Sequence, residues 1–405
     1  MPIATEQILD VLRQYGIYPL DDDYAEIDLP GIGVIEEGEG VYSTSLNEVL
    51  GRGDEGEMAY PDWPLADDPR MREWLDELEK IMGGSNRKFP VHRKPRRAEQ
   101  PEPHCAWYCP VHFFGHGWGI YIRESCILSH ALDIATFVDW RGVHLPHGDI
   151  AHHLLRSAFY VFFLHEQFHH KVESLGLRLL ISTASDRYRP YKTNVYRRTF
   201  NTSDCIEESL ANAESYRRLN EPRYTRRVDP AIRAGLRRYL KWSIPQQPLG
   251  YREGVNFLLE SPYRDGLYDL QSQMLDGRLP TSTPKANWSV APNMITSLAD
   301  ITDDIYVVLP KGARPIFRPT SVDPGSTVSS QALEGALTRH YGYRPVAGGK
   351  GSHVKLKKPG SPTIILPGNR STVSPGVVKN VLQALGGHPI SRLPDLLDGK
   401  IAMHV

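Results

Sequence analysis

One stretch of the sequence places two imidazoles and a carboxylate at the end of an unusually apolar segment. Seven apolar or aromatic residues, 158–164, lead directly into His165, Glu166 and, three positions later, His169. A helix that is apolar on every side is expected to be buried. Burying imidazole and carboxylate groups costs free energy unless they have partners. The stretch therefore predicts a buried helix, and a metal ion is the partner that would satisfy its polar end.

The spacing of these polar residues fits a metal-binding helix. Residues four positions apart share one face of a helix, so His165 and His169 point the same way. Glu166 lies beside them and is placed to act as general base on a metal-bound water. This H-E-x-x-H pattern is typical of zinc hydrolases. The alternative is a helix end whose polar side chains are merely solvated.

A catalytic zinc ion with two histidine ligands needs a third protein ligand and one open position for water. Good helix formers follow a capping serine or aspartate at residues 203 and 204, which predicts a second helix. This helix carries two adjacent carboxylates, Glu207 and Glu208. Either of them could complete the zinc site.

The two helices together resemble the zincins, and in particular the gluzincin group of metallopeptidases. In that group the second helix carries the pattern E-x-x-x-D, in which the glutamate binds zinc and the aspartate orients a histidine. Here Glu208 and Asn212 stand at these positions. Only Glu208 has such a companion, which favours it over Glu207, although Glu207 stays open. The resemblance covers roughly residues 105 to 300 and implies a Zn²⁺-dependent peptide hydrolase.

Two other features of this region bear on the predicted site. Glu173 lies four positions after His169 and could orient a histidine without binding the metal itself. Residues 118–122 read as a strand that precedes the metal helix. In zincins an edge strand at this place holds extended substrate.

A cluster of cysteines and histidines precedes that strand. Cys105, Cys109, His112 and His116 are residue types that bind zinc. Their spacing does not suit a zinc finger, because only two residues separate Cys109 from His112. Two interpretations stay open: a second metal site, or a buried loop that leads into the strand.

Composition sets limits on the class of protein. A length of 405 residues predicts two or three domains, and a net charge of −1 gives no overall field toward nucleic acid or membrane. The N-terminal residues do not form a signal peptide, and no apolar run is long enough to span a bilayer. Four cysteines do not suggest a disulfide scaffold. We therefore expect a cytoplasmic protein with no membrane partner.

Changes in composition divide the chain into an α+β multidomain arrangement. Residues 1–82 form an acidic N-terminal α/β module in which we find no chemistry. Residues 83–104, rich in proline and basic side chains, form a linker, and residues 319–328 form another. Between these linkers lies the predicted zincin-like metallopeptidase domain, 105–318. A C-terminal domain occupies residues 329–395.

Turn signals predict two hairpins. Residues 31–41 read as a hairpin that turns at residues 36–38. A second hairpin would join residues 305–309 to residues 314–317 through a Pro-Lys-Gly turn.

The C-terminal domain has the order α-β-β-β-α. A helix capped by Ser329 or Ser330 precedes three short strands, and a last helix has Pro375 in its first turn. The strands are predicted near residues 343–347, 352–357 and 363–366. This order is like that of the double-stranded-RNA-binding fold.

This domain also resembles a HicA-type toxin. The segments that carry the resemblance are residues 350–355 (KGSHVK), 364–367 (IILP) and 374–382 (SPGVVKNVL). HicA proteins are small mRNA interferases with one catalytic histidine in a Gly-Ser-His strand, which here is His353. Family members often carry a second histidine after the proline that ends the next strand, whereas Gly368 and Asn369 stand there in this chain.

The HicA resemblance implies RNA as a partner. A neutral His353 imidazole could take the proton of a 2′-hydroxyl and start RNA cleavage. The side chains expected to hold phosphates are Lys350, Lys355, Lys357, Lys358 and Arg370. A domain that binds RNA without cleaving it is the alternative.

These features support three functional hypotheses. The leading one is a zinc-dependent metallopeptidase fused to a HicA-like domain, in a bacterial toxin–antitoxin or phage-defence context, with an antitoxin protein as a possible partner. The second is an RNA-binding or RNA-cleaving toxin in which the zincin domain is a structural or regulatory platform. The third is a nonenzymatic scaffold with a structural zinc ion.

Overall fold

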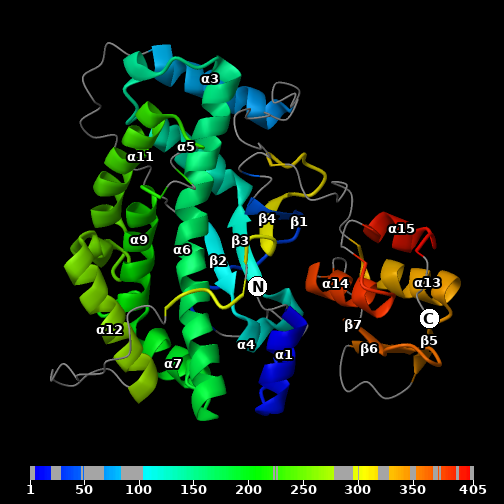
Figure 1. Ribbon diagram of the computed structural model, residues 1–405. Coiled ribbons are helices and arrows are strands. Elements are labelled where there is room, and N and C mark those ends of the chain that lie inside the picture. The colour runs from blue at the N-terminus through cyan, green and yellow to red at the C-terminus, as the bar shows by residue number, and fades with distance from the viewer. Residues whose placement is uncertain are drawn as a thin grey trace.

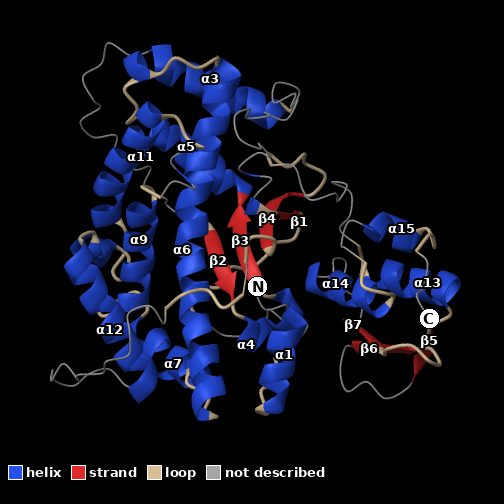
Figure 2. Ribbon diagram, in the orientation of Figure 1, coloured by secondary structure: helices blue, strands red, loops and turns tan. Residues whose placement is uncertain are grey.

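The computed structural model combines helices with two small sheets, an α+β arrangement (Figures 1 and 2). The residues that it describes are 5–19, 29–46, 49, 68–83, 104–221, 224, 227–277, 295–299, 301–317, 328–346, 353–367, 373, 375–388 and 392–401.

The helices and strands follow one another along the chain as labelled in Figure 1. The α-helices are α1 (Thr5–Gln14), α3 (Pro69–Gly83), α4 (Val111–Phe114), α5 (Glu124–Ala135), α6 (His147–Thr183), α7 (Tyr188–Tyr191), α8 (Arg197–Thr199), α9 (Ile206–Arg218), α11 (Pro230–Ser243), α12 (Glu260–Asp276), α13 (Ser330–Tyr341), α14 (Pro375–Ala384) and α15 (Leu393–Leu397). The strands are β1 (Glu39–Thr44), β2 (Ala106–Cys109), β3 (Gly119–Arg123), β4 (Ile305–Pro310), β5 (Arg344–Val346), β6 (His353–Lys357) and β7 (Ile364–Pro367).

Helix α6 carries the H-E-x-x-H motif and runs through the middle of the larger part of the molecule (Figure 1). Its 37 residues make a rod of about 55 Å at 1.5 Å per residue. Most of the helix between residues 150 and 180 is buried, as its apolar sequence predicts. Gly176 lies within this helix, and Tyr188 packs closely against it: an added Cβ would lie 2.6 Å from that of Tyr188. Among the described residues, no helix has the length and apolarity needed to cross a bilayer.

A four-stranded sheet lies beside α6, with the strand order β1-β4-β3-β2. Strand β4 pairs antiparallel with β1 and parallel with β3, and β2 pairs antiparallel with β3. Strand β2 is therefore at the edge of the sheet. The strand predicted at residues 118–122 corresponds to β3, which lies inside the sheet and not at its edge as expected.

Neither predicted hairpin forms within the described residues. The chain does turn at residues 36–38, but the strand that follows, β1, pairs with β4 from the other end of the domain. Residues 29–35 contain no strand, and neither do residues 311–317 after β4. The turns were predicted correctly. The predicted strand partners were wrong, because β1 and β4 pair with each other although they are far apart in the chain.

The two faces of this sheet have different covers. Ile120 of β3 points toward α5 and α6 and belongs to the largest buried cluster. Trp107 of β2 and Tyr121 of β3 point to the opposite face, where Ile32 and Ile35 pack against them. Alternate residues of a strand face opposite sides of the sheet, which accounts for the division.

The described residues among the first 82 do not build a core of their own. Leu12 of α1 and Trp74 of α3 belong to the same buried cluster as Ile127 of α5 and Phe159 of α6. Strand β1 also completes the sheet of the larger domain. The segments predicted as separate units, 1–82 and 105–318, thus share one core.

The predicted linkers lie almost entirely outside the described residues. Of the linker at 83–104 the structure describes only the two ends, and of the linker at 319–328 only residue 328.

The C-terminal unit has the α-β-β-β-α order that the sequence predicts, with α15 added after it (Figure 2). Its strands form an antiparallel sheet in the order β5-β6-β7. Leu337 of α13, Leu356 of β6, Leu366 of β7 and Val381 of α14 are fully buried in a cluster separate from that around α6. The unit therefore has its own hydrophobic core.

Candidate metal centre

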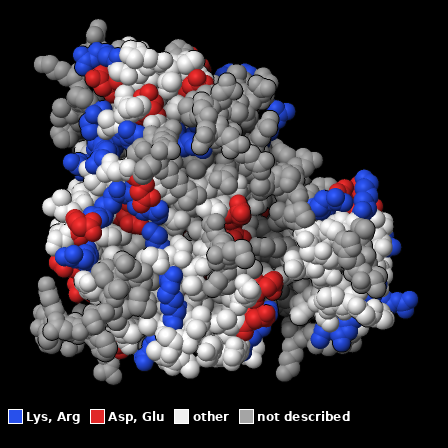
Figure 3. Space-filling view, in the orientation of Figure 1, with Lys and Arg blue, Asp and Glu red and all other residues white. Residues whose placement is uncertain are grey.

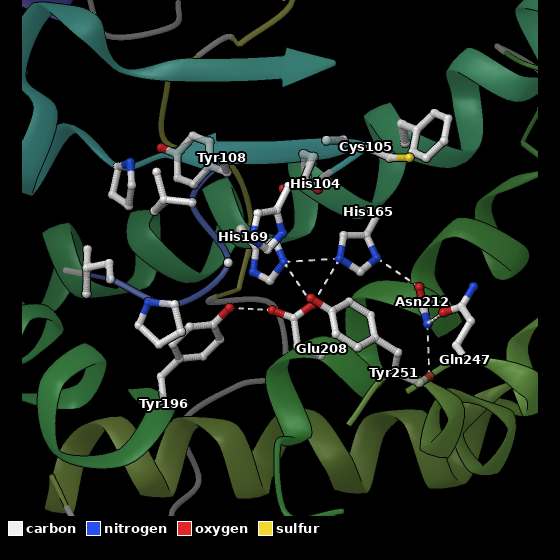
Figure 4. Close-up of a pocket in the computed structure, with 18 of the residues that line it drawn as sticks. His104, Cys105, Tyr108, His165, His169, Tyr196, Glu208, Asn212, Gln247 and Tyr251 are labelled. Carbon is white, nitrogen blue, oxygen red and sulfur yellow. Dashed lines mark hydrogen bonds and ion pairs between the residues drawn. The ribbon is translucent and has the colours of Figure 1, made fainter. Parts of the chain in front are cut away.

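Helices α6 and α9 pack side by side and bring together three side chains that could hold a metal ion (Figure 4). The Nε2 atom of His165 lies 3.1 Å from Oε2 of Glu208 and 3.3 Å from Nε2 of His169. The Nε2 atom of His169 lies 3.5 Å from the same carboxylate oxygen. Among the described residues this is the only group of three or more histidine, cysteine, aspartate or glutamate side chains that could hold a metal ion.

The spacing of the three donor atoms fits a tetrahedral zinc site. With zinc–ligand bonds of about 2.0–2.1 Å, the ligand atoms of a tetrahedron lie roughly 3.3–3.4 Å apart. The three distances between His165, His169 and Glu208, 3.1 to 3.5 Å, match these edges. Among the described residues the group offers three ligands, and a site with three protein ligands and one open corner is typical of catalytic rather than structural zinc.

The outer nitrogen of each histidine is held by an oxygen that can only accept a hydrogen bond. Nδ1 of His165 lies 2.9 Å from Oδ1 of Asn212, and Nδ1 of His169 lies 2.6 Å from Oε1 of Glu207. Each Nδ1 must therefore carry the hydrogen when the ring is neutral. The lone pair of each Nε2 then points at the carboxylate of Glu208, as metal coordination requires.

Asn212 contacts His165, and other contacts fix the orientation of its amide. Its Nδ2 donates to the side chain of Gln247 and, at 2.9 Å, to the backbone oxygen of Tyr251. The Oδ1 atom is thereby left for His165. The Tyr251 ring also stacks on the His165 ring, with an interplanar angle of 12°.

The buried group favours a positive charge. Burial alone would lower the pKa of His169, but Glu208 and Glu207 outweigh this effect and raise the pKa to about 10. Burial likewise opposes ionisation of Glu208, yet the two histidines hold its pKa well below its usual range. A proton or a metal cation between these groups would relieve the same electrostatic need.

Glu207, the alternative metal ligand, points away from the group and holds His169 instead. Its Oε1 accepts from Nζ of Lys192 at 3.0 Å, and its Oε2 accepts from the hydroxyl of Tyr191 at 2.8 Å. Burial would raise the pKa of Glu207, but Lys192 and His169 lower it. Glu207 is thus a buried anion that orients a histidine, the role that the family pattern assigns to an aspartate.

The residues that support the two glutamates come from a segment that no sequence motif singles out. Lys192 and Tyr196 lie at the two ends of a π-helical turn, Lys192–Tyr196, and π-helical turns are frequent at functional sites. The Tyr196 hydroxyl donates to Oε1 of Glu208, which leaves Oε2 for the histidines. No spacing rule connects this turn to α9, so only the folded contacts identify it.

Glu166 lines the same cavity as the metal group. The cavity has a volume of about 190 Å³ and lies between α6, α9 and the edge strand β2. Burial raises the pKa of the Glu166 carboxyl, while His165 and His169 oppose the rise. A carboxylate with a raised pKa beside a metal group is suited to accept a proton from water.

Glu173 does not have the role predicted for it. Its carboxylate accepts from Nδ1 and the backbone N–H of His112, from the backbone N–H of Val111 and from the hydroxyl of Tyr108. These groups lie where β2 passes into α4. Glu173 therefore ties the end of the edge strand to α6. None of these hydrogen bonds involves His165 or His169.

Of the two interpretations left open for Cys105, Cys109, His112 and His116, the structure does not support a second metal site, because it does not bring these four side chains together as a group that could hold an ion. Cys105 forms a disulfide with Cys126 of α5. Cys109 is a buried free thiol, His112 binds Glu173, and Nδ1 of His116 lies 3.4 Å from Oε1 of Glu6. The second interpretation, a buried loop leading into β3, describes this segment.

The predicted RNA-binding residues are described in part. His353 begins β6 and pairs in register with Pro367, but its side chain lies outside what the structure describes. Lys350 and Arg370 also fall outside the described residues. Lys357 is exposed, and Lys355 and Lys358 are half-buried.

The outer face of the C-terminal sheet is basic. Because Leu356 faces the core, Lys355 and Lys357 point to the opposite face. Arg344 is directly across from Lys357, and Ile365, which is 52% exposed, is directly across from Lys355. Figure 3 shows lysine and arginine side chains at the outer surface of this unit, on the right of the view.

Comparison with known proteins gives no relative. No protein-family model, curated protein sequence or solved structure matches the chain. The case for a function therefore rests on the geometry of the site and on the chemistry of its residues.

The contact between Lys192 and Glu207 predicts a selective effect on metal binding. Replacing Lys192 with methionine leaves Glu207 buried without its cation, so the carboxylate should hold His169 less well. We expect zinc affinity, measured by competition with a chelator, to fall about 10- to 100-fold, as for other residues that orient metal ligands.

Lys171→Met is the matched control for this change. Lys171 of α6 forms a largely buried ion pair with Glu214 of α9, and neither of these residues is in the metal group. Both variants should lower the melting temperature, and only Lys192→Met should weaken zinc binding. Equal losses of zinc affinity would show that Lys192 acts only through general stability.

Proposed function

We propose that this chain is a zinc-dependent metallopeptidase. The observation that carries the proposal is the convergence of His165, His169 and Glu208 at tetrahedral distances, with Glu166 lining the same cavity. The open fourth corner argues against the third hypothesis, a closed structural zinc site in a scaffold.

In this proposal each residue of the site has a separate role in peptide hydrolysis. His165, His169 and Glu208 would hold the ion. A zinc ion there would supply Lewis acidity, which polarises the substrate carbonyl and lowers the pKa of water. Glu166 accepts a proton from the attacking water and delivers it to the leaving amine, for which its raised pKa is suited.

Strand β2 offers a place for the substrate backbone. One side of β2 pairs with β3. Ala106 and Tyr108 of the same strand line the cavity. A peptide can add to the edge of a sheet through main-chain hydrogen bonds. The tie between Glu173 and the end of β2 would keep this edge fixed relative to the metal group on α6.

RNA binding by the C-terminal unit is the second candidate function. The basic outer face of its sheet, with Arg344, Lys355 and Lys357, favours it. Cleavage through His353, an antitoxin partner and a toxin–antitoxin or phage-defence context rest on the HicA resemblance alone. So does the second hypothesis, in which the RNA function is primary and the metal domain is a platform.

A cytoplasmic location also stays a prediction. The Cys105–Cys126 pair forms a disulfide here, whereas reducing systems keep most cytosolic thiols reduced. In that compartment we expect the same pair to be two adjacent thiols between β2 and α5.

Two variants test the peptidase proposal. His165→Ala removes a ligand and should abolish zinc uptake, measured by atomic absorption on the purified protein. Glu166→Gln keeps the shape of the side chain but not its basicity. It should therefore bind zinc normally and lose hydrolysis of a peptide library, followed by mass spectrometry. Hydrolysis by Glu166→Gln at the wild-type rate would contradict the assigned role.

Charge reversal tests the RNA proposal in the full-length protein. Lys355→Glu/Lys357→Glu should weaken RNA binding and lower the dependence of log K on log salt by about 0.7 for each phosphate that the variant no longer neutralises. Glu166→Gln is the control and should bind RNA like the wild type. Equal binding by the wild type and the double variant at low salt would show that the basic face does not bind RNA.

A further inference from the structure

A segment from the N-terminal part of the chain enters the candidate metal centre. Residues 29–33, called the strap below, lie just before β1. Leu29, Gly31 and Ile32 line the same cavity as His169 and Glu208 (Figure 4, blue ribbon). The strap is therefore part of the wall that a substrate would meet.

The strap is held against the edge strand on one side. Gly33 lies so close to the Trp107 ring of β2 that an added Cβ would be 2.5 Å from it. Arg123 of β3 donates to the backbone oxygen of Val34 and also binds Glu39 at the start of β1. These contacts fix the chain where it passes β2, next to the face of the four-stranded sheet that carries Trp107 and Tyr121.

On its other side the strap packs against Tyr196, whose hydroxyl donates to Glu208. Gly31 has φ of +85°, and a Cβ built on it would lie 2.9 Å from the Tyr196 hydroxyl and 3.4 Å from the Phe200 ring. The strap backbone thus spans from the edge strand to the π-helical turn, next to the metal group.

The space left beside the metal group is small. The cavity of about 190 Å³ is smaller than most ligand pockets, which measure about 300–1,000 Å³. An extended peptide that crosses the site would advance about 3.3 Å per residue along β2. The strap therefore narrows the space beside the metal group through which such a peptide would have to run.

We propose that the strap determines substrate size, so that the site as folded accepts a short peptide or the end of a chain, not the middle of an extended polypeptide. This inference rests on the proposed peptidase function and concerns the same site. Leu29 and Ile32 line the cavity, and Gly31 and Gly33 allow the strap to approach Tyr196 and Trp107.

Hydroxamate binding to the zinc-loaded full-length protein tests the proposal without requiring a known substrate. The probes are acetohydroxamate and a tetrapeptide hydroxamate, and calorimetry gives their dissociation constants. Gly31→Ala should displace the strap, and Leu29→Ala/Ile32→Ala should widen the cavity. Gly38→Ala is the matched control, because Gly38 has a similar φ of +93° but open space around it.

The ratio of the two dissociation constants decides the outcome. At least one strap variant should favour the tetrapeptide probe over acetohydroxamate by about tenfold, or 1.4 kcal/mol, relative to the wild type and to Gly38→Ala. An unchanged ratio in both strap variants would overturn the role of the strap. Failure of the wild type to take up zinc, or of either probe to bind it, would instead overturn the proposed function and this inference with it.

Discussion

Three buried atoms that can accept a hydrogen bond or bind a cation face one another between α6 and α9. Because such atoms repel one another, the neighbouring side chains must hold them in place. Nε2 of His165, Nε2 of His169 and a carboxylate oxygen of Glu208 lie within 3.5 Å of one another, and all three accept when both rings are neutral. Such a group is stable only with a cation between its members. The raised pKa of His169 shows the same need, met by a proton when no metal is present.

Each donor atom in this group is held by a second contact. Asn212 and Glu207 fix the two rings, Tyr196 fixes Glu208, and Lys192 neutralises Glu207. A buried carboxylate that orients a histidine needs its own compensation, because an unpaired buried charge is costly. The π-helical turn supplies both the cation and the tyrosine, so it belongs to the site although it contributes no ligand.

The sequence predicted the parts of this site that depend on local spacing. Helical spacing placed His165 and His169 on one face, whereas the resemblance to the gluzincin pattern pointed to Glu208 and Asn212. Helical spacing failed for Glu173, because position on a helix does not show which neighbouring segment will offer hydrogen-bond donors. The pairing of β1 with β4 and the shared core of α1 and α6 could not be predicted either, since they join segments far apart in the chain.

The central claim is that α6 and α9 form an open zinc site from two imidazoles and one carboxylate. X-ray absorption spectroscopy of the zinc-loaded full-length protein tests this claim most directly. We expect about one zinc ion per chain, coordinated only by nitrogen and oxygen, with two imidazoles and one exchangeable ligand. Sulfur coordination, or an unchanged spectrum after replacement of both His165 and His169, would contradict it.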